Sequence, residues 1–246
     1  MKKIIYGIIT LLIIIFAVNM IIDNNKKNID VSQGINILKD LESRNVTLVK
    51  NEIDQFRNET FVDENNDFSN LTYSQRFANS VIMGDSLAEG FSDYGIIDKS
   101  NVIANKGMVV SKAGEEISKA ISKNPENIFI SLGTNDIGYY NGNSEKFINY
   151  YRQLINQIKE SLPNTKIYIN CIMPVEEKAI ENKPYLIHID DFNAALKNLC
   201  NETDNTYIDN SMLIEGVENI YQNDGIHFKY EFYPLWIENM AKYAGI

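Results

Sequence analysis

The chain has 246 residues, a hydrophobic content of 44% and a formal net charge of −10 at pH 7. This length and hydrophobic content exclude a disordered protein and fit one globular domain with a short additional segment. The acidic balance argues against nucleic acid as a partner, because an acidic surface repels phosphate backbones.

The N-terminus has the pattern of a membrane anchor. Two lysines precede residues 4–22, an apolar stretch that is broken at only three positions. As a helix it would be about 28 Å long, close to the roughly 30 Å hydrocarbon core of a bilayer. No small-x-small cleavage site closes this long stretch, so we favour an uncleaved anchor over a cleaved signal peptide and a secreted protein. Residues 1–3 are then cytoplasmic, and the chain after the anchor of this single-pass protein is extracellular.

A polar segment rich in Asn, Lys, Asp and Glu follows at residues 23–76. Apolar residues recur in it at helical spacing, as Val31, Ile35 and Leu38 do. We interpret the segment as a partly helical stalk between the membrane and a folded domain. The sequence leaves open whether the stalk packs on that domain or on a second copy, and with it the oligomeric state.

An alternation of strands and helices begins at Phe77 and continues to the C-terminus. Five short apolar runs predict strands at residues 80–83, 101–104, 128–132, 166–172 and 206–208. Three apolar stripes predict helices at residues 147–162, 189–199 and 233–243. This pattern implies a three-layer α/β/α domain over residues 77–246, with a central, mainly five-stranded parallel sheet.

The first predicted strand ends in Gly84, Asp85 and Ser86, and a polar segment punctuated by glycine follows. A serine in this place can lie at a helix N-terminus, where free N–H groups favour developing negative charge. Functional sites of parallel sheets form beyond the carboxyl ends of the strands, so Ser86 is a candidate nucleophile. The alternative is that Asp85 and Ser86 only cap the next helix.

Two further stretches follow predicted strands in the same way. Gly107 comes after the second strand, so its N–H can lie open in the crevice, although an isolated turn glycine has the same pattern. Asn135 comes after the third strand and can turn its amide toward an oxyanion, although an Asx turn is the simpler reading.

The last stretch contains one of the two histidines of the chain. Asp224 lies three residues before His227, across a turn glycine, so its carboxylate can bind one ring nitrogen and stabilise an imidazolium. A surface acid beside a core histidine is the alternative. His188 has no acid three residues before it, and we interpret it as structural or as part of a substrate rim.

Together these four stretches resemble the SGNH hydrolases, the superfamily of the GDSL esterases and lipases, over residues 77–246. The block around Gly107 is the weakest match, and Gly114 is a looser match than the family usually shows. The resemblance implies a flavodoxin-like fold and a serine esterase. Its expected site residues are the nucleophile Ser86, the base His227, the orienting Asp224, and an oxyanion hole of Ser86, Gly107 and Asn135.

Family analogy and the predicted location favour an extracytoplasmic esterase acting on a small acyl group, such as O-acetyl on a cell-wall or surface carbohydrate. The acyl group would pass to water or to a sugar hydroxyl. The alternatives are a lipase or lysophospholipase and a non-catalytic glycan-binding module. Substrate-binding residues are not assigned, beyond a polar, aromatic rim suggested by Tyr139, Tyr140, Asn141 and Asn143.

No cofactor or metal ion is expected. The acids around Asp204 and Asp209 lack ligand spacing, and the sequence contains no glycine-rich phosphate loop. Cys171 and Cys200 fit no zinc or redox spacing, and both lie in apolar runs. We expect them to be core residues, with one disulfide as the alternative.

Overall fold

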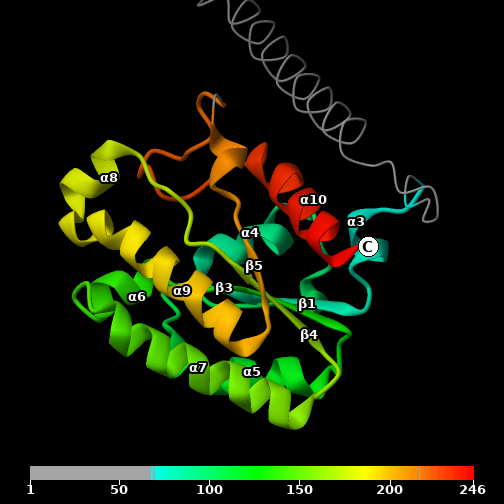
Figure 1. Cartoon of the computed structure of the whole chain (residues 1–246). Coiled ribbons are helices and arrows are strands. Elements are labelled where there is room, and N and C mark those ends of the chain that lie inside the picture. The colour runs from blue at the N-terminus through cyan, green and yellow to red at the C-terminus, as the bar shows by residue number, and fades with distance from the viewer. Residues whose placement is uncertain (1–67, 69, 216) are drawn as a thin grey trace, which may run out of the picture. The chain divides into compact units, whose positions relative to one another are not determined.

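The computed structural model describes residue 68 and residues 70–246 with the exception of residue 216 (Figure 1). The predicted anchor at residues 4–22 and most of the predicted stalk lie outside the described residues. Within the described part of the chain, no helix is long and apolar enough to cross a membrane.

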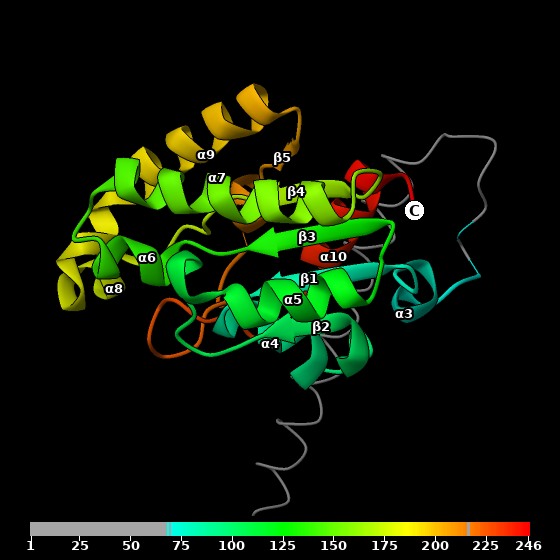
Figure 2. The ribbon, with the colours of Figure 1, turned by 90° about the horizontal axis from the view of Figure 1, so that it is seen from below.

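Five parallel strands form the sheet at the centre of the fold (Figures 1 and 2). They are β1 (Ser80–Gly84), β2 (Val102–Ala104), β3 (Asn127–Ser131), β4 (Lys166–Asn170) and β5 (Thr206–Ile208). Each coincides with a predicted strand to within two residues at either end. The spatial order β2-β1-β3-β4-β5 places β2 and β3 on opposite sides of β1, so the order reverses beside the carboxyl end of β1.

Helices connect the strands and cover the sheet. They are α3 (Tyr73–Arg76), α4 (Ser86–Asp93), α5 (Gly114–Ser122), α6 (Thr134–Tyr139), α7 (Ser144–Ser161), α8 (Glu177–Asn182), α9 (Ile189–Thr203) and α10 (Phe232–Ala244). Short 3-10 helices are η1 (Lys99–Asn101), η2 (Val110–Lys112), η3 (Pro184–His188) and η4 (Ser211–Ile214). The three predicted helical stripes are confirmed as α7, α9 and α10.

Consecutive strand residues pack on opposite faces of the sheet, as the pleat requires. In β1, Val81 and Met83 join the core cluster that contains residues of α5, α7 and α9. Ile82 between them joins the second cluster, which contains residues of α4 and α10. Ile128 and Phe129 of β3 divide in the same way. Both faces of the sheet are therefore buried, which explains the continuous apolar runs of its strands.

Gly84 allows β1 to end tightly against its neighbours. A Cβ atom at this position would lie 2.5 Å from the Ser131 carbonyl oxygen and 2.6 Å from Cβ of Ala88. The Gly84 carbonyl accepts the Asn105 N–H at 3.2 Å, so β1 stays joined to the loop after β2 at this point. The chain then turns at once into α4, and Ser86 becomes the first residue of that helix.

Candidate active site

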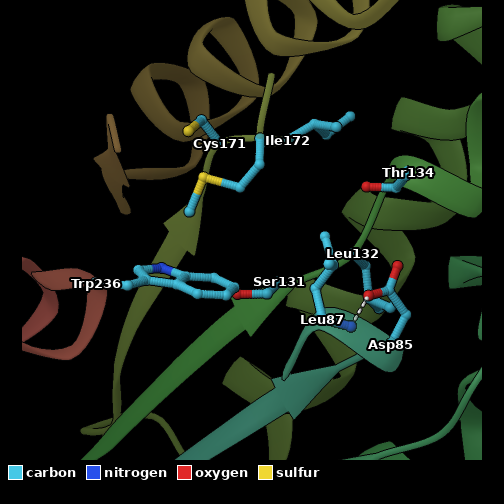
Figure 3. Close-up of a pocket in the computed structure, with 9 residues that line it drawn as sticks. Asp85, Leu87, Ser131, Leu132, Thr134, Cys171, Ile172 and Trp236 are labelled. Atoms are coloured by element: carbon cyan, nitrogen blue, oxygen red, sulfur yellow. Dashed lines mark hydrogen bonds between the residues drawn. The ribbon is translucent and has the colours of Figure 1, made fainter. Parts of the chain in front are cut away.

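Ser86 lies at the N-terminus of α4, beside the reversal of strand order. The preceding residue, Asp85, is the N-cap of the helix, and its Oδ1 accepts the Leu87 N–H at 3.0 Å, the dashed line in Figure 3. Ser86 itself is half-buried. Its N–H belongs to the first turn of α4, where helical geometry offers no acceptor for it.

A chain of hydrogen bonds joins Ser86 to His227 and Asp224. The Ser86 Oγ lies 2.9 Å from Nε2 of His227, and Nδ1 of the same ring lies 2.5 Å from Oδ2 of Asp224. A carboxylate only accepts hydrogen bonds, so Nδ1 carries the ring proton and Nε2 is left as an acceptor. The arrangement can therefore take the hydroxyl proton of Ser86 onto His227.

The turn at residues 221–228 carries both of these partners. Tyr221 and Phe228 form an antiparallel bridge, and the Gln222 N–H donates to the His227 carbonyl at 2.7 Å. Ile226 is buried in one core cluster and Phe228 in the other. These two anchors flank His227 in the chain and fix the turn, while 32% of the His227 side chain stays exposed.

Asp224 is held ionised by the same turn. Its Oδ1 accepts the N–H groups of Ile226 and His227, both at 3.0 Å. Partial burial on its own would raise the pKa of Asp224, but the hydrogen bonds from the Ile226 N–H and from the ring and N–H of His227 lower it to about 2. At neutral pH the carboxylate is therefore an acceptor for the imidazole.

In the structure, the side chain of Asn135 contacts Asp85, the residue before Ser86. Asn135 is the second residue of α6, and its Nδ2 lies 2.9 Å from Oδ2 of Asp85 and 3.3 Å from the Met108 carbonyl oxygen. The sequence indicated Asp85 only as a helix cap. Its contact with Asn135 joins positions 50 residues apart, and no local pattern signals such a pair.

Gly107 lies in the exposed loop after β2, with φ at +75°. No atom lies within 4 Å of where its Cβ would be, so the loop is open on that side. The side chain of Asn105 donates a short hydrogen bond to Glu116 of α5, which is only 8% exposed. Glu116 was not predicted as a site residue, although it lies on the apolar face of α5 with Ala120, an unusual place for an acid.

Two carboxyl groups are buried beneath these loops. Burial, the largest effect, raises the pKa of Asp85 to about 6 and that of Asp136 to about 7. The Asp136 Oδ1 accepts the Val110 N–H at 2.9 Å. Among the described residues, no group of three or more His, Cys, Asp or Glu side chains is placed to hold a metal ion. Cys171 and Cys200 are buried free thiols.

His188 and Tyr139 lie on the surface, whereas Tyr140 is half-buried against the core cluster of α7 and α9. His188 Nδ1 is 2.9 Å from Oδ2 of Asp191, so the acid partner of this histidine lies three residues after it in the sequence and not three residues before it. Tyr139 is the last residue of α6, and 52% of its surface is exposed. The Lys112 Nζ lies 4.7 Å from the centre of its ring.

A small cavity lies beneath the N-terminus of α4 (Figure 3). Its volume of about 10 Å³ is roughly what one water molecule needs. The buried Ser131 Oγ in its wall has no hydrogen-bond partner among the described residues. The other lining residues are Asp85, Leu87, Leu132, Thr134, Cys171, Ile172, Met173 and Trp236. This cavity has room for a water molecule but not for an acyl chain.

The region that carries these residues matches a known family in sequence. The sequence model of the GDSL-like lipase/acylhydrolase family matches residues 82–234, which include Ser86, Gly107, Asn135 and His227. No curated protein is significantly similar to the chain.

Three solved structures illustrate the similarity in fold. A GDSL-like lipase candidate from Parabacteroides merdae is 18% identical with a TM-score of 0.57, over 68% of this chain and 94% of that one. A family 3 carbohydrate esterase from Talaromyces cellulolyticus is 14% identical with a TM-score of 0.53, over 67% and 95%. A mutant of a Geobacillus acetyl-xylooligosaccharide esterase is 15% identical with a TM-score of 0.53, over 68% and 94%. At these identities the likeness shows a shared fold.

Proposed function

Because the chain belongs to the GDSL-like lipase/acylhydrolase family, we propose that it is a serine esterase with Ser86 as its nucleophile. The observation that carries the proposal is the hydrogen-bonded chain from Ser86 Oγ through His227 to the Asp224 carboxylate. Ser86 attacks the acyl carbonyl as His227 takes its proton, and Asp224 stabilises the imidazolium. His227 then gives the proton to the leaving alcohol, and water releases the acyl group from Ser86.

The negative charge of the tetrahedral intermediate needs donors near Ser86. We assign this role to the N–H groups of Ser86 and Gly107 and to the side-chain amide of Asn135. The first lies at a helix N-terminus, which favours negative charge, and the second lies in an open loop. The third reaches the N-cap of the same helix. Preorganised donors of this kind are worth about 10²–10³ each in turnover.

We further propose a small acyl group, such as acetyl, on a surface or cell-wall carbohydrate. Two of the similar structures are a carbohydrate esterase and an acetyl-xylooligosaccharide esterase. Tyr139 follows Asn135 by four residues, so both lie on the same face of α6, one turn apart. An exposed aromatic ring at that distance suits the apolar C–H face of a sugar ring.

The experiment that tests the esterase is acetate release by the full chain in detergent from p-nitrophenyl acetate and from acetylated xylooligosaccharides. We expect turnover that Ser86→Ala and His227→Ala abolish to the same extent, since the two residues act as a unit. Undiminished turnover by Ser86→Ala would exclude Ser86 as the nucleophile. A p-nitrophenyl palmitate rate above the acetate rate would exclude the small acyl group and favour a lipase.

The variant Tyr139→Ala tests the proposal that the substrate is a carbohydrate. The variant should raise KM for the acetylated oligosaccharide about three- to tenfold, the equivalent of one lost aromatic contact, and leave hydrolysis of p-nitrophenyl acetate unchanged. Tyr243→Ala is the matched control, because Tyr243 is also an exposed tyrosine, 44% exposed, but lies near the end of α10. Equal KM values for both variants would remove Tyr139 from the substrate site.

For location, we propose that residues 4–22 anchor the chain in the cell membrane with the catalytic domain outside. The length of the apolar stretch and the two lysines before it support this orientation. External protease treatment of intact cells should then degrade the domain, and alkaline washing should leave the chain in the membrane fraction.

A further inference from the structure

Asp85 connects the two helices that deliver Ser86 and Asn135. The residue is only 2% exposed, although the next residue in the chain, Ser86, contacts His227. One carboxylate oxygen accepts the Leu87 N–H at 3.0 Å, and the other accepts Nδ2 of Asn135 at 2.9 Å. Both oxygens are thus used, one at the start of α4 and one at the start of α6.

The amide of Asn135 has two hydrogens and two acceptors of unequal strength. The bond to the Asp85 carboxylate is charge-assisted and has a normal length of 2.9 Å. The bond to the neutral Met108 carbonyl is 3.3 Å long, at the weak end of the range. Because the amide group is planar, fixing one N–H also fixes the direction of the other.

Asp85 also determines which end of the amide faces it. An ionised carboxylate can only accept, so it selects the NH₂ end of Asn135 and excludes the carbonyl oxygen. With the amide turned over, its carbonyl oxygen would take the place of the second N–H and would repel an oxyanion there.

We propose that Asp85 is a positioning residue that orients Asn135 for the oxyanion hole. It holds one N–H of the Asn135 amide, and the second N–H, which rests on the Met108 carbonyl, is presented to the oxyanion when substrate arrives. The inference rests on the proposed esterase function. It assigns to Asp85 a role in the reaction beyond that of a helix cap.

The variant Asp85→Asn separates this role from capping. Asparagine caps a helix as well as aspartate, so its Oδ1 keeps the Leu87 N–H. Its Nδ2 then faces Asn135, and two NH₂ groups cannot bond each other, so the Asn135 amide must turn over. We expect kcat for p-nitrophenyl acetate at pH 8 to fall about 10²–10³-fold, as for the loss of one oxyanion donor, with KM within about threefold of wild type.

A double variant shows whether Asp85 acts through Asn135. Asp85 also interacts electrostatically with His227, so the double variant must separate an effect through Asn135 from an effect on His227. If the proposal holds, Asp85→Asn combined with Asn135→Ala is no slower than Asn135→Ala alone. A further large loss in the double variant would overturn the proposal, as would a kcat of Asp85→Asn within threefold of wild type.

Asp209→Asn is the matched control. Asp209 is exposed, and its Oδ1 accepts the N–H two residues later at 3.0 Å, as that of Asp85 does. This variant should keep wild-type kcat, because the Asp209 side chain has no contact with Asn135.

A spectroscopic measurement decides the inference even if the esterase proposal fails. Failure of that proposal would show as turnover that does not need Ser86, or as no turnover. In the ¹H–¹⁵N spectrum of the full chain, the side-chain NH₂ of Asn135 is assigned by its absence from Asn135→Ala. One of its two protons should lie far downfield in the wild type and lose that shift in Asp85→Asn. An unchanged Asn135 signal in Asp85→Asn would overturn the positioning role.

Discussion

At the scale of single residues, the Asp224 carboxylate determines which nitrogen of His227 is free to accept a proton in the proposed esterase. Asp224→Asn keeps an oxygen for the N–H groups of Ile226 and His227, so the turn should persist. Its NH₂ group would face Nδ1 and force the ring proton onto Nε2, where it blocks transfer from Ser86. We therefore expect kcat to fall by up to about 10⁴-fold with little change in thermal stability, measured with p-nitrophenyl acetate and by calorimetry.

Asp191→Asn provides the control for this prediction. It changes the same kind of contact, an aspartate bound to Nδ1 of a histidine, at the exposed His188. Its activity should equal that of wild type. Equal losses in the two variants would mean that Asp224 has no special role in the reaction.

Residues close in sequence were the ones that could be predicted. Asp224 and His227 are three residues apart, and their contact is local, so the spacing alone suggested it. The contact between Asp85 and Asn135 depends on β1 and β3 being neighbours in the sheet, which the sequence does not state. The contact between Glu116 and Asn105, in the loop after β2, likewise depends on how the chain folds.

At the scale of elements, α3 is tied to α10 by a buried ion pair. The Arg76 guanidinium lies 2.8 Å from the Glu238 carboxylate, and their side chains are 3% and 2% exposed. Glu238→Gln would leave the buried guanidinium without its counter-charge, which typically costs about 3–5 kcal/mol in the free energy of unfolding. Urea denaturation should show this loss, with esterase activity unchanged below the transition.

An exposed ion pair serves as the control for this measurement. Glu202 binds Arg152 at 2.5 Å, with side chains 56% and 39% exposed. Glu202→Gln should lower the free energy of unfolding by at most about 1 kcal/mol, because solvent screens exposed pairs. If Glu238→Gln were as mild, α3 would contribute little to the stability of the domain.

The elements differ in how well the sequence predicted them, and burial explains why. The strands carry continuous apolar runs and α7, α9 and α10 carry long apolar stripes, since each packs on a core cluster. Helix α6 has only six residues, including Gly138, and its pattern is too short to recognise. Asp136 holds α6 in place by accepting the Val110 N–H, a contact that exists only in the folded chain. Helix α3 falls within the segment interpreted as a stalk, yet Arg76 packs on α10.

At the scale of the whole molecule, the two buried carboxyls make stability depend on pH. The pKa of Asp85 is raised to about 6 and that of Asp136 to about 7, in both cases chiefly by burial, from an ordinary value of 3.8. The folded chain therefore binds these protons more tightly than the unfolded chain. Its free energy of unfolding should rise as the pH falls through 7 and 6, and should lose this contribution as the pH rises again.

The fold should consequently be more stable at pH 5 than at pH 8, while the proposed esterase needs Asp85 ionised and loses activity over the same interval. One pKa unit corresponds to about 1.4 kcal/mol, and pH 5 lies about one unit below the raised pKa of Asp85, so Asp85 contributes roughly 1.4 kcal/mol over this range. The lowered pKa of Asp224 has the opposite effect and makes the fold less stable as the pH falls, but only between its ordinary value of 3.8 and about 2. The melting temperature should therefore rise as the pH is lowered from 8 to 5. This rise should be smaller in the Asp136→Asn variant. A melting temperature that falls over this range would mean that neither carboxyl takes up a proton in the folded chain.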